Sequence, residues 1–188
     1  MGYRRGFKTE ARTLALEVRA ELRLHALDRL DPRALAAHLE IPTWTVSEFV
    51  AERPCVAPLL TTELSAFSAA TVFDGTRRTI VHNDGHTSAR QNSNLAHELA
   101  HGLLLHPPTP ALDDTGCRNW NEDIEDEASW LAGELLVTVE AAMAVARGQW
   151  TMSAAGERLG VSQELMRYRL NMTGARKIVQ RAASRRTA

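Results

Sequence analysis

Cysteine is scarce in this 188-residue chain, which contains only Cys55 and Cys117. Two cysteines so far apart cannot build the disulfide framework of a small secreted protein, and a chain of this length can bury a sufficient core without one. No uninterrupted apolar run approaches the roughly 20 residues that span a bilayer, and no apolar segment follows the basic N-terminus. We therefore expect a cytoplasmic protein with no membrane partner.

A large net charge is also lacking, since the formal value is −1 at pH 7. The chain as a whole is therefore not drawn to nucleic acid or to an anionic membrane. The charges are nevertheless unevenly distributed. Residues 113–134 are mainly acidic, whereas residues 165–188 contain seven basic and no acidic side chains. We interpret the basic C-terminus as a solvated, partly disordered tail.

Hydrophobic periodicity predicts a mainly helical α+β fold with a small sheet. The expected helices cover residues 9–27, 32–39, 94–106, 124–147, 152–159 and 163–170. Two expected strands, residues 69–73 and 79–82, are joined through Asp74-Gly75, which is typical of a hairpin. Strand-like residues also occupy positions 41–50.

The last two expected helices have the form of a helix-turn-helix pair. Gly160 lies in the turn between them, and Ser162 is placed to cap the second helix. We expect residues 1–150 to form the main domain and residues 151–188 to form a helical C-terminal part packed on it.

The most informative segment is His97-Glu98-Leu99-Ala100-His101, which lies in an apolar run that favours a helix. Two histidines four residues apart on a helix share one face, about 5–6 Å apart between Cβ atoms, and can bind one tetrahedral zinc ion. Glu98 then lies beside the metal, where its carboxylate can take a proton from a bound water. This pentapeptide is the HExxH pattern of zinc peptidases.

A zinc peptidase site needs a third protein ligand and one open position for water. The candidate ligands are carboxylates at the start of the next expected helix, namely Glu122, Glu125 and Glu127. Acidic side chains are favoured at the start of any helix because they interact with the helix dipole. Position alone therefore does not choose among the three.

For other polar side chains near the motif, the sequence indicates a role less specifically. His82, His86 and Arg90 precede the HExxH helix, and one of them could stabilise the oxyanion of a tetrahedral intermediate. His106 lies five residues beyond the motif, which turns it off the ligand face, and we expect it to meet the last carbonyls of the helix. We expect Cys117 to be a free thiol in a surface loop.

Residues 95–106, LAHELAHGLLLH, resemble the signature of the ImmA/IrrE metallo-endopeptidases, and residues 125–136, EDEASWLAGELL, resemble the second motif of that family. The resemblance implies a zincin-like domain in which the small sheet lies beside the HExxH helix. It implies these roles: His97, His101 and Glu125 as zinc ligands, Glu98 as general base, and Glu127 as the alternative third ligand.

The second motif departs from the family pattern at several positions. Ser129 stands where the family usually has asparagine, and Leu131 where it usually has phenylalanine. We expect these departures to affect packing rather than chemistry, because none is expected to touch a ligand.

The resemblance also implies a substrate, namely a helix-turn-helix transcriptional repressor of a mobile element, a phage or a stress response. A strand of the predicted hairpin would bind this substrate in extended form by β-augmentation. The alternative is a DNA-binding or protein-binding regulator with a structural or vestigial zinc site, whose C-terminal helices and basic tail contact phosphates. We do not favour direct nucleic-acid binding, because a four-residue catalytic set is hard to reconcile with DNA binding alone.

Overall fold

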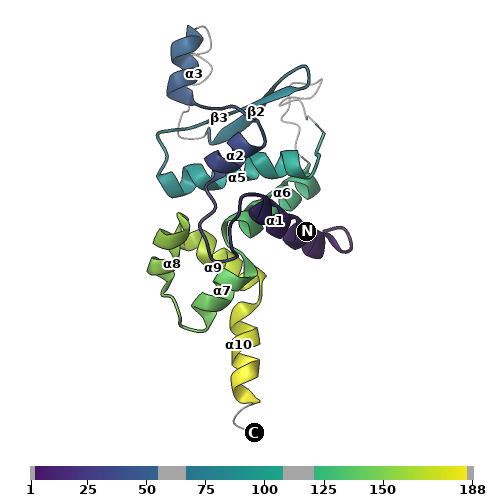
Figure 1. Ribbon diagram of the computed structural model, residues 1–188, viewed down its shortest axis with the longest axis vertical. Helices are drawn as coiled ribbons and strands as arrows, with labels where there is room; N and C mark the ends of the chain where they lie inside the picture. Colours follow the sequence, from purple (N-terminus) through teal and green to yellow (C-terminus); the bar gives the residue numbers. More distant parts are fainter. Residues whose placement is uncertain (1–2, 55–66, 108–120, 186–188) are drawn as a thin grey trace.

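The computed structural model describes residues 3–54, 67–107 and 121–185. These residues form nine helices and one three-stranded sheet, which lies toward one end of the molecule, so the mainly helical α+β prediction is confirmed (Figure 1). The elements, in chain order, are α1 (Phe7–Glu21), α2 (Pro32–His38), β1 (Thr43–Thr45), α3 (Val46–Glu52), β2 (Ala69–Asp74), β3 (Arg77–His82), α5 (Ser88–Leu103), α6 (Glu122–Leu136), α7 (Val139–Ala146), α8 (Met152–Leu159), α9 (Gln163–Met172) and α10 (Ala175–Ser184).

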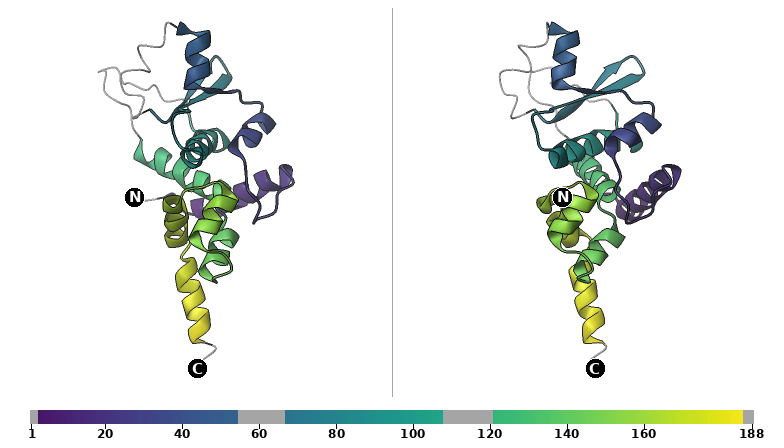
Figure 2. Two further views of the ribbon diagram at one scale, coloured as in Figure 1. Left: turned by 90° about the vertical axis from the view of Figure 1, so that its left-hand side faces the viewer. Right: turned by 60° about the vertical axis from the view of Figure 1, so that its left-hand side comes forward.

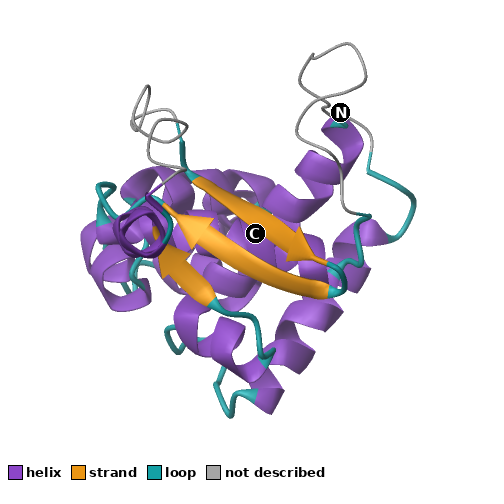
Figure 3. Ribbon diagram, turned by 90° about the horizontal axis from the view of Figure 1, so that it is seen from above, coloured by secondary structure: helices purple, strands orange, loops and turns teal. Residues whose placement is uncertain are grey.

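The sheet has the order β1-β3-β2, with β1 parallel and β2 antiparallel to β3. The predicted hairpin is present, but Asp74 still belongs to β2 and pairs with Arg77, so the turn residues are Gly75 and Thr76. Gly75 takes a positive φ of 58° that suits glycine. Figure 3 looks onto the sheet and shows most of the helices gathered behind it. Helix α5 packs against both hairpin strands and, on another side, against α6.

The hydrophobic core lies mainly where α1, α5 and α6 meet under the sheet. Helix α5 buries Leu95, Ala96, Leu99 and Ala100, which are spaced along one side of the helix. The rest of the core includes Phe7, Ala11, Ile80, Ala128, Leu131 and Leu135. Because α5 turns these apolar residues inward, its polar residues 97, 98 and 101 lie outside the core.

Helices α1 and α5 differ from their predicted bounds by up to six residues. The first expected helix, residues 9–27, runs instead from Phe7 to Glu21, and it ends where Arg23 takes a positive φ of 57°. Helix α5 begins six residues earlier than expected, at Ser88, because the side chain of Thr87 accepts a hydrogen bond from the Arg90 amide. It ends at Leu103, so His106 lies beyond the helix.

The strand expected over residues 41–50 is wrong beyond Thr45. Thr45 and Glu48 form a capping box, in which each side chain hydrogen-bonds to the backbone of the other residue. This pair starts α3 directly after the short strand β1. The capping-box pattern, threonine followed three residues later by glutamate, is present in the sequence and outweighs the β-prone residues around it.

The single helix expected over residues 124–147 is in fact two helices, bent by 64° at a short break. Val137 is extended, and Thr138 caps α7 by accepting a hydrogen bond from the Ala141 amide. The Thr138 hydroxyl also donates to the carbonyl of Ala26 at 2.8 Å, which holds the break against the segment after α1. No single described helix is both long and apolar enough to cross a membrane; only the bent pair α6 and α7 passes that test together.

Helices α8 and α9 form the predicted helix-turn-helix pair, with Gly160 at a φ of 69° and Ser162 as the N-cap of α9. The basic C-terminus, interpreted as a solvated, partly disordered tail, contains a helix that was not predicted, α10 over residues 175–184. Figures 1 and 2 show α10 projecting away from the other helices. The division of the chain at residue 150 stays a prediction.

A buried ion pair joins α9 to α6. Nη2 of Arg169 lies 2.6 Å from Oε1 of Glu134, and the two side chains are 0% and 4% exposed. Arg169 also donates from Nε to the carbonyl of Val137 at 3.0 Å, while Arg19 of α1 donates to the carbonyl of Leu135 at 2.7 Å. Two arginines therefore bind the carbonyls at the C-terminal end of α6, where helix carbonyls lack partners within the helix.

Candidate metal centre

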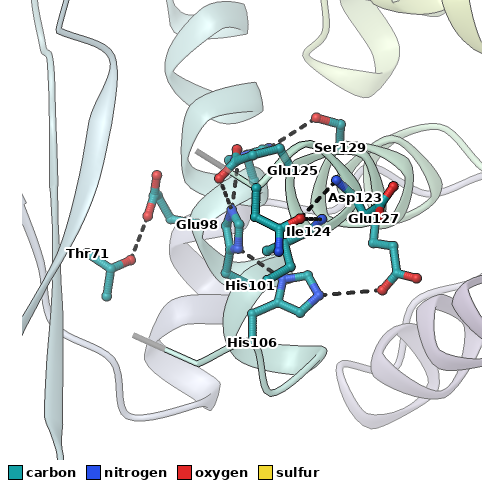
Figure 4. A network of polar contacts seen from close by, with 11 residues as sticks. Thr71, Glu98, His101, His106, Asp123, Ile124, Glu125, Glu127 and Ser129 are labelled. Carbon is teal, nitrogen blue, oxygen red and sulfur yellow. Dashed lines mark hydrogen bonds and ion pairs between the residues drawn. The ribbon is translucent and has the colours of Figure 1, made fainter. Parts of the chain in front are cut away.

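Helices α5 and α6 bring three side chains with metal-binding atoms together. His97 and His101 lie one turn apart on α5, and Glu125 faces them from the first turn of α6 (Figure 4). One donor atom from each residue lies within 4.8 Å of the other two. Helix α6 begins at Glu122 because the side chain of Asn121 caps it, accepting hydrogen bonds from the amides of Asp123 and Ile124.

The donor atoms lie close to the separation expected around a tetrahedral zinc ion, with the two histidines facing different oxygens of the Glu125 carboxylate. Ligand atoms about 2.0–2.1 Å from such an ion lie about 3.3–3.4 Å from one another. Here Nε2 of His97 lies 3.1 Å from Nε2 of His101 and 3.1 Å from Oε2 of Glu125, and Nε2 of His101 lies 3.6 Å from Oε1 of Glu125. The three side chains are 22–26% exposed, so water can reach the cluster. The residues therefore fit a three-ligand zinc site.

The electrostatics of the cluster also suit a cation. Hydrogen bonds with His101 and then His97 hold the pKa of Glu125 well below its usual range. Glu125 therefore remains a carboxylate near neutral pH, which is the form that binds a metal.

Glu98 lies next to the donor cluster but points toward the sheet. Its Oε2 accepts a hydrogen bond of 2.6 Å from the hydroxyl of Thr71 on β2 (Figure 4). The carboxylate is thus fixed between the two histidines of α5 and the outer strand of the hairpin, where it can exchange a proton with a water.

Ser129 touches a donor residue, which corrects the expectation that no departure from the family pattern touches a ligand. It lies one turn after Glu125 on α6, and its Oγ is 3.4 Å from Nδ1 of His97. The outer nitrogen of this histidine therefore faces a hydroxyl. A hydrogen bond to the ring nitrogen that does not face the metal orients a histidine ligand.

We expected the ring of His106 to meet the last carbonyls of α5, but it contacts His101 and Glu127 instead. Its Nδ1 lies 3.0 Å from Nδ1 of His101, and its Nε2 lies 3.6 Å from Oε2 of Glu127. Burial, and then the charge of His101, lower the pKa of His106, which favours its neutral ring.

Of the three acidic candidates, the structure brings Glu125 to the histidines. Glu127 points elsewhere, because it contacts His106 and its Oε1 accepts a hydrogen bond of 3.1 Å from Nε of Arg4. Glu122 is exposed at the first residue of α6.

Two of the three candidates for oxyanion contacts, His86 and Arg90, have other partners, whereas Nδ1 of His82 is buried without a hydrogen-bond partner. His82 is only 2% exposed within the sheet, and burial lowers its pKa. His86 lies between Asn83 and Asn94, at 3.5 Å and 3.3 Å, and Nη2 of Arg90 lies 3.4 Å from Oγ of Ser68. Cys117 lies outside the described residues.

Three residues near the cluster were not predicted: Thr71, Ser129 and Arg4. Ser129 could have been found, because it follows Glu125 by four residues and so shares its helix face. Thr71 and Arg4 reach the site from distant parts of the chain, and the sequence carries no local signal for either contact.

Comparison with known proteins agrees with this geometry. The model of the IrrE N-terminal-like domain, Peptidase_M78, matches residues 55–171, which is more than half of the chain and contains both helices of the donor cluster. No curated protein matches the chain at a significant level of similarity. The family supports a metallopeptidase-type function, and His97, His101 and Glu125 suggest a metal site. The chain therefore belongs to the IrrE N-terminal-like domain family of peptidases.

Proposed function

We propose that this chain is a zinc-dependent endopeptidase that hydrolyses a peptide bond beside His97, His101 and Glu125. The observation that carries the proposal is the position of Glu98. Its carboxylate is held by Thr71 next to a cluster of three donor atoms that lie within 4.8 Å of one another. A site that only held a structural metal would not need this further carboxylate, whereas a peptidase needs one for proton transfer.

The chemistry divides between the metal and the protein. His97, His101 and Glu125 would hold a zinc ion, which would supply Lewis acidity to the scissile carbonyl and to water. Glu98 accepts a proton from the attacking water at a carboxylate oxygen and passes it to the leaving amine. The hydrogen bond from Thr71 orients this carboxylate for both transfers.

Strand β2 is our proposed binding surface for the substrate backbone. It is the outer strand on its side of the described sheet, and it carries Thr71 beside Glu98. Its residues Val72 and Phe73 are 46% and 38% exposed. An extended peptide added along this edge would lie next to the donor cluster and would be held through its main chain.

The proposed substrate is a helix-turn-helix transcriptional repressor, cleaved in the cytoplasm. The support for this substrate is the resemblance of the two motifs to the ImmA/IrrE metallo-endopeptidases. The edge of β2 adds a requirement, because only a segment that can become extended would fit it. We therefore expect cleavage in a linker or an exposed loop of the repressor.

Metal stoichiometry tests the proposed centre first. Elemental mass spectrometry of wild-type protein incubated with zinc should give about one zinc per chain, since the site holds one tetrahedral ion. The Glu125→Ala variant should lose this zinc. The matched control is Glu122→Ala, which removes an exposed acid from the same helical turn and should retain it. Absence of zinc from the wild type would end the enzyme proposal.

Glu98→Gln separates catalysis from metal binding. This variant keeps the shape and the zinc but lacks the group that accepts a proton. Incubated with a candidate repressor, the wild type should produce two fragments and Glu98→Gln none. Cleavage by Glu98→Gln would remove Glu98 from its proposed role.

A DNA-binding regulator is the second candidate, and one observation favours it. Helices α8 and α9 form a helix-turn-helix pair, and the neighbouring α10 carries Arg176, Lys177 and Arg181 on its exposed surface. Binding to random duplex that weakens steeply with salt would support this function. No binding at low salt would exclude it.

A further inference from the structure

His106 forms a bridge between the donor cluster and Glu127. Nδ1 of His106 lies 3.0 Å from Nδ1 of His101, and Nε2 of His106 lies 3.6 Å from Oε2 of Glu127. The side chains of His106 and Glu127 are only 9% and 15% exposed, so water competes little for these contacts. Neither residue is part of the proposed ligand set.

The bridge continues to the N-terminal segment. Nε of Arg4 donates to Oε1 of Glu127 at 3.1 Å. Arg4 is itself held by Glu10 through two hydrogen bonds of 2.6 Å and 2.7 Å, and its guanidinium lies over the ring of Phe7 at 5.2 Å. Glu127 is therefore fixed from both sides, by His106 and by Arg4.

The positions of the protons follow from the geometry. His101 faces the donor cluster with Nε2, so a metal there would take that lone pair and leave the ring proton on Nδ1. The nearest partner of this proton is Nδ1 of His106, which must then be an acceptor. The proton of His106 is consequently on Nε2, on the side of the Glu127 carboxylate. That Nε2 is buried without a hydrogen-bond partner, because its 3.6 Å separation from Oε2 of Glu127 is longer than a hydrogen bond, so the two groups interact through charge.

We propose that His106 and Glu127 are positioning residues that hold His101 in the tautomer and orientation required for metal binding, and that Arg4 fixes Glu127. This inference rests on the proposed metal centre. It also explains why Glu127, two residues from Glu125, is not a third ligand. Loss of such a partner behind a histidine ligand typically weakens metal affinity about 10- to 100-fold.

Two substitutions at position 106 distinguish positioning from packing. His106→Leu keeps much of the buried volume but has no acceptor for the proton on Nδ1 of His101. His106→Asn has a smaller side chain whose Oδ1 is an acceptor close to the position of the lost Nδ1. If the residue only filled space, His106→Leu would be the milder change.

The measurement is the zinc dissociation constant, obtained by competition with a chromophoric chelator, together with the visible spectrum of the cobalt-loaded protein. We expect His106→Leu and Glu127→Ala to weaken zinc binding at least tenfold and to alter the cobalt spectrum. His106→Asn should recover most of the lost affinity. Glu122→Ala, which removes a carboxylate from α6 outside the bridge, should bind as the wild type does.

The possible outcomes separate this inference from the proposed function. Wild-type zinc affinity in His106→Leu would overturn the inference and leave the metal centre intact. Equal losses in His106→Leu and His106→Asn would overturn it in favour of a packing role. A wild type that binds no zinc would overturn the metal centre and the inference together.

Discussion

The hydroxyl of Thr71 donates a hydrogen bond of 2.6 Å to Oε2 of Glu98, so a residue of the outer strand holds the proposed general base. The two residues are 27 positions apart in the chain. The contact therefore depends on how the hairpin lies on α5, and it couples the proposed peptide-binding strand to the proposed proton transfer.

Thr71→Val should slow catalysis without removing the metal. Valine keeps the shape of threonine but cannot donate, and a hydrogen bond to a carboxylate contributes about 1.5–3 kcal/mol. We expect kcat for peptide cleavage to fall by about tenfold or more, with one zinc retained and KM little changed. The control is Thr79→Val on β3, which should leave kcat unchanged. An unaltered kcat in Thr71→Val would show that Glu98 is oriented without Thr71.

Removing one partner of the buried ion pair should destabilise the fold. Arg169→Met leaves the carboxylate of Glu134 buried and unpaired, which typically costs about 3–5 kcal/mol of unfolding free energy. Adding Glu134→Leu removes that charge, so the double variant should recover much of the loss. Urea unfolding of both variants measures the difference. A double variant less stable than Arg169→Met would mean that the pair stabilises the fold beyond charge neutralisation.

Two glycines should respond differently to alanine. A Cβ at Gly133 would lie 2.9 Å from Cδ of Arg169, whose guanidinium is held in the buried ion pair, whereas a Cβ at Gly102 would meet the guanidinium end of the half-buried Arg78. Gly133→Ala should lower the unfolding free energy by about 1–3 kcal/mol because Arg169 cannot move.

For Gly102→Ala we expect little loss, since the end of Arg78 can swing aside and alanine is favoured over glycine in a helix by up to about 1 kcal/mol. Thermal unfolding of both variants makes the comparison. Equal destabilisation would mean that Arg78 is held as firmly as Arg169.

The stability of the fold should decrease in mild acid, in part through His82. Burial, and then the charge of Arg33, lower the pKa of His82 in the folded protein below its ordinary value near 6.5. Between these two pKa values the unfolded chain binds a proton that the folded chain does not. The contribution is therefore complete above about pH 6.5 and is lost as the pH falls toward the lower, folded-state pKa.

The His82→Gln variant tests this contribution, because glutamine does not titrate. The unfolding free energy can be measured in urea at several pH values between 7.5 and about 5. It should fall less steeply with decreasing pH in His82→Gln than in the wild type. Parallel pH profiles would assign the loss to other groups.

Local signals predicted much of the fold and the central part of the site. The spacing of His97 and His101 placed them together, and Asp74-Gly75 located the hairpin. The break at Val137-Thr138 was missed because apolar periodicity continues through it. The sequence feature that marks the break is Thr138, which can cap the following helix. The hydrogen bond from its hydroxyl to the carbonyl of Ala26 further stabilises the break.

The choice between Glu125 and Glu127 could not be made from local pattern alone. The two side chains lie on different faces of α6, so the choice depends on how this helix is rotated against α5. Packing of Ala128 and Leu131 in the core fixes that rotation, and Arg4 holds Glu127 away from the cluster. Both effects arise only when distant segments meet.

Two arginines that support α6, Arg4 and Arg19, lie in the N-terminal part of the chain, so removing that part would affect α6. Arg4 and Arg19 hold Glu127 and the last turn of α6, yet both precede residues 55–171, the part of the chain that matches the family. A protein that began at residue 55 would retain the donors and lose these supports. The stretch that matches the family model is therefore smaller than the part of the chain that supports the donor cluster.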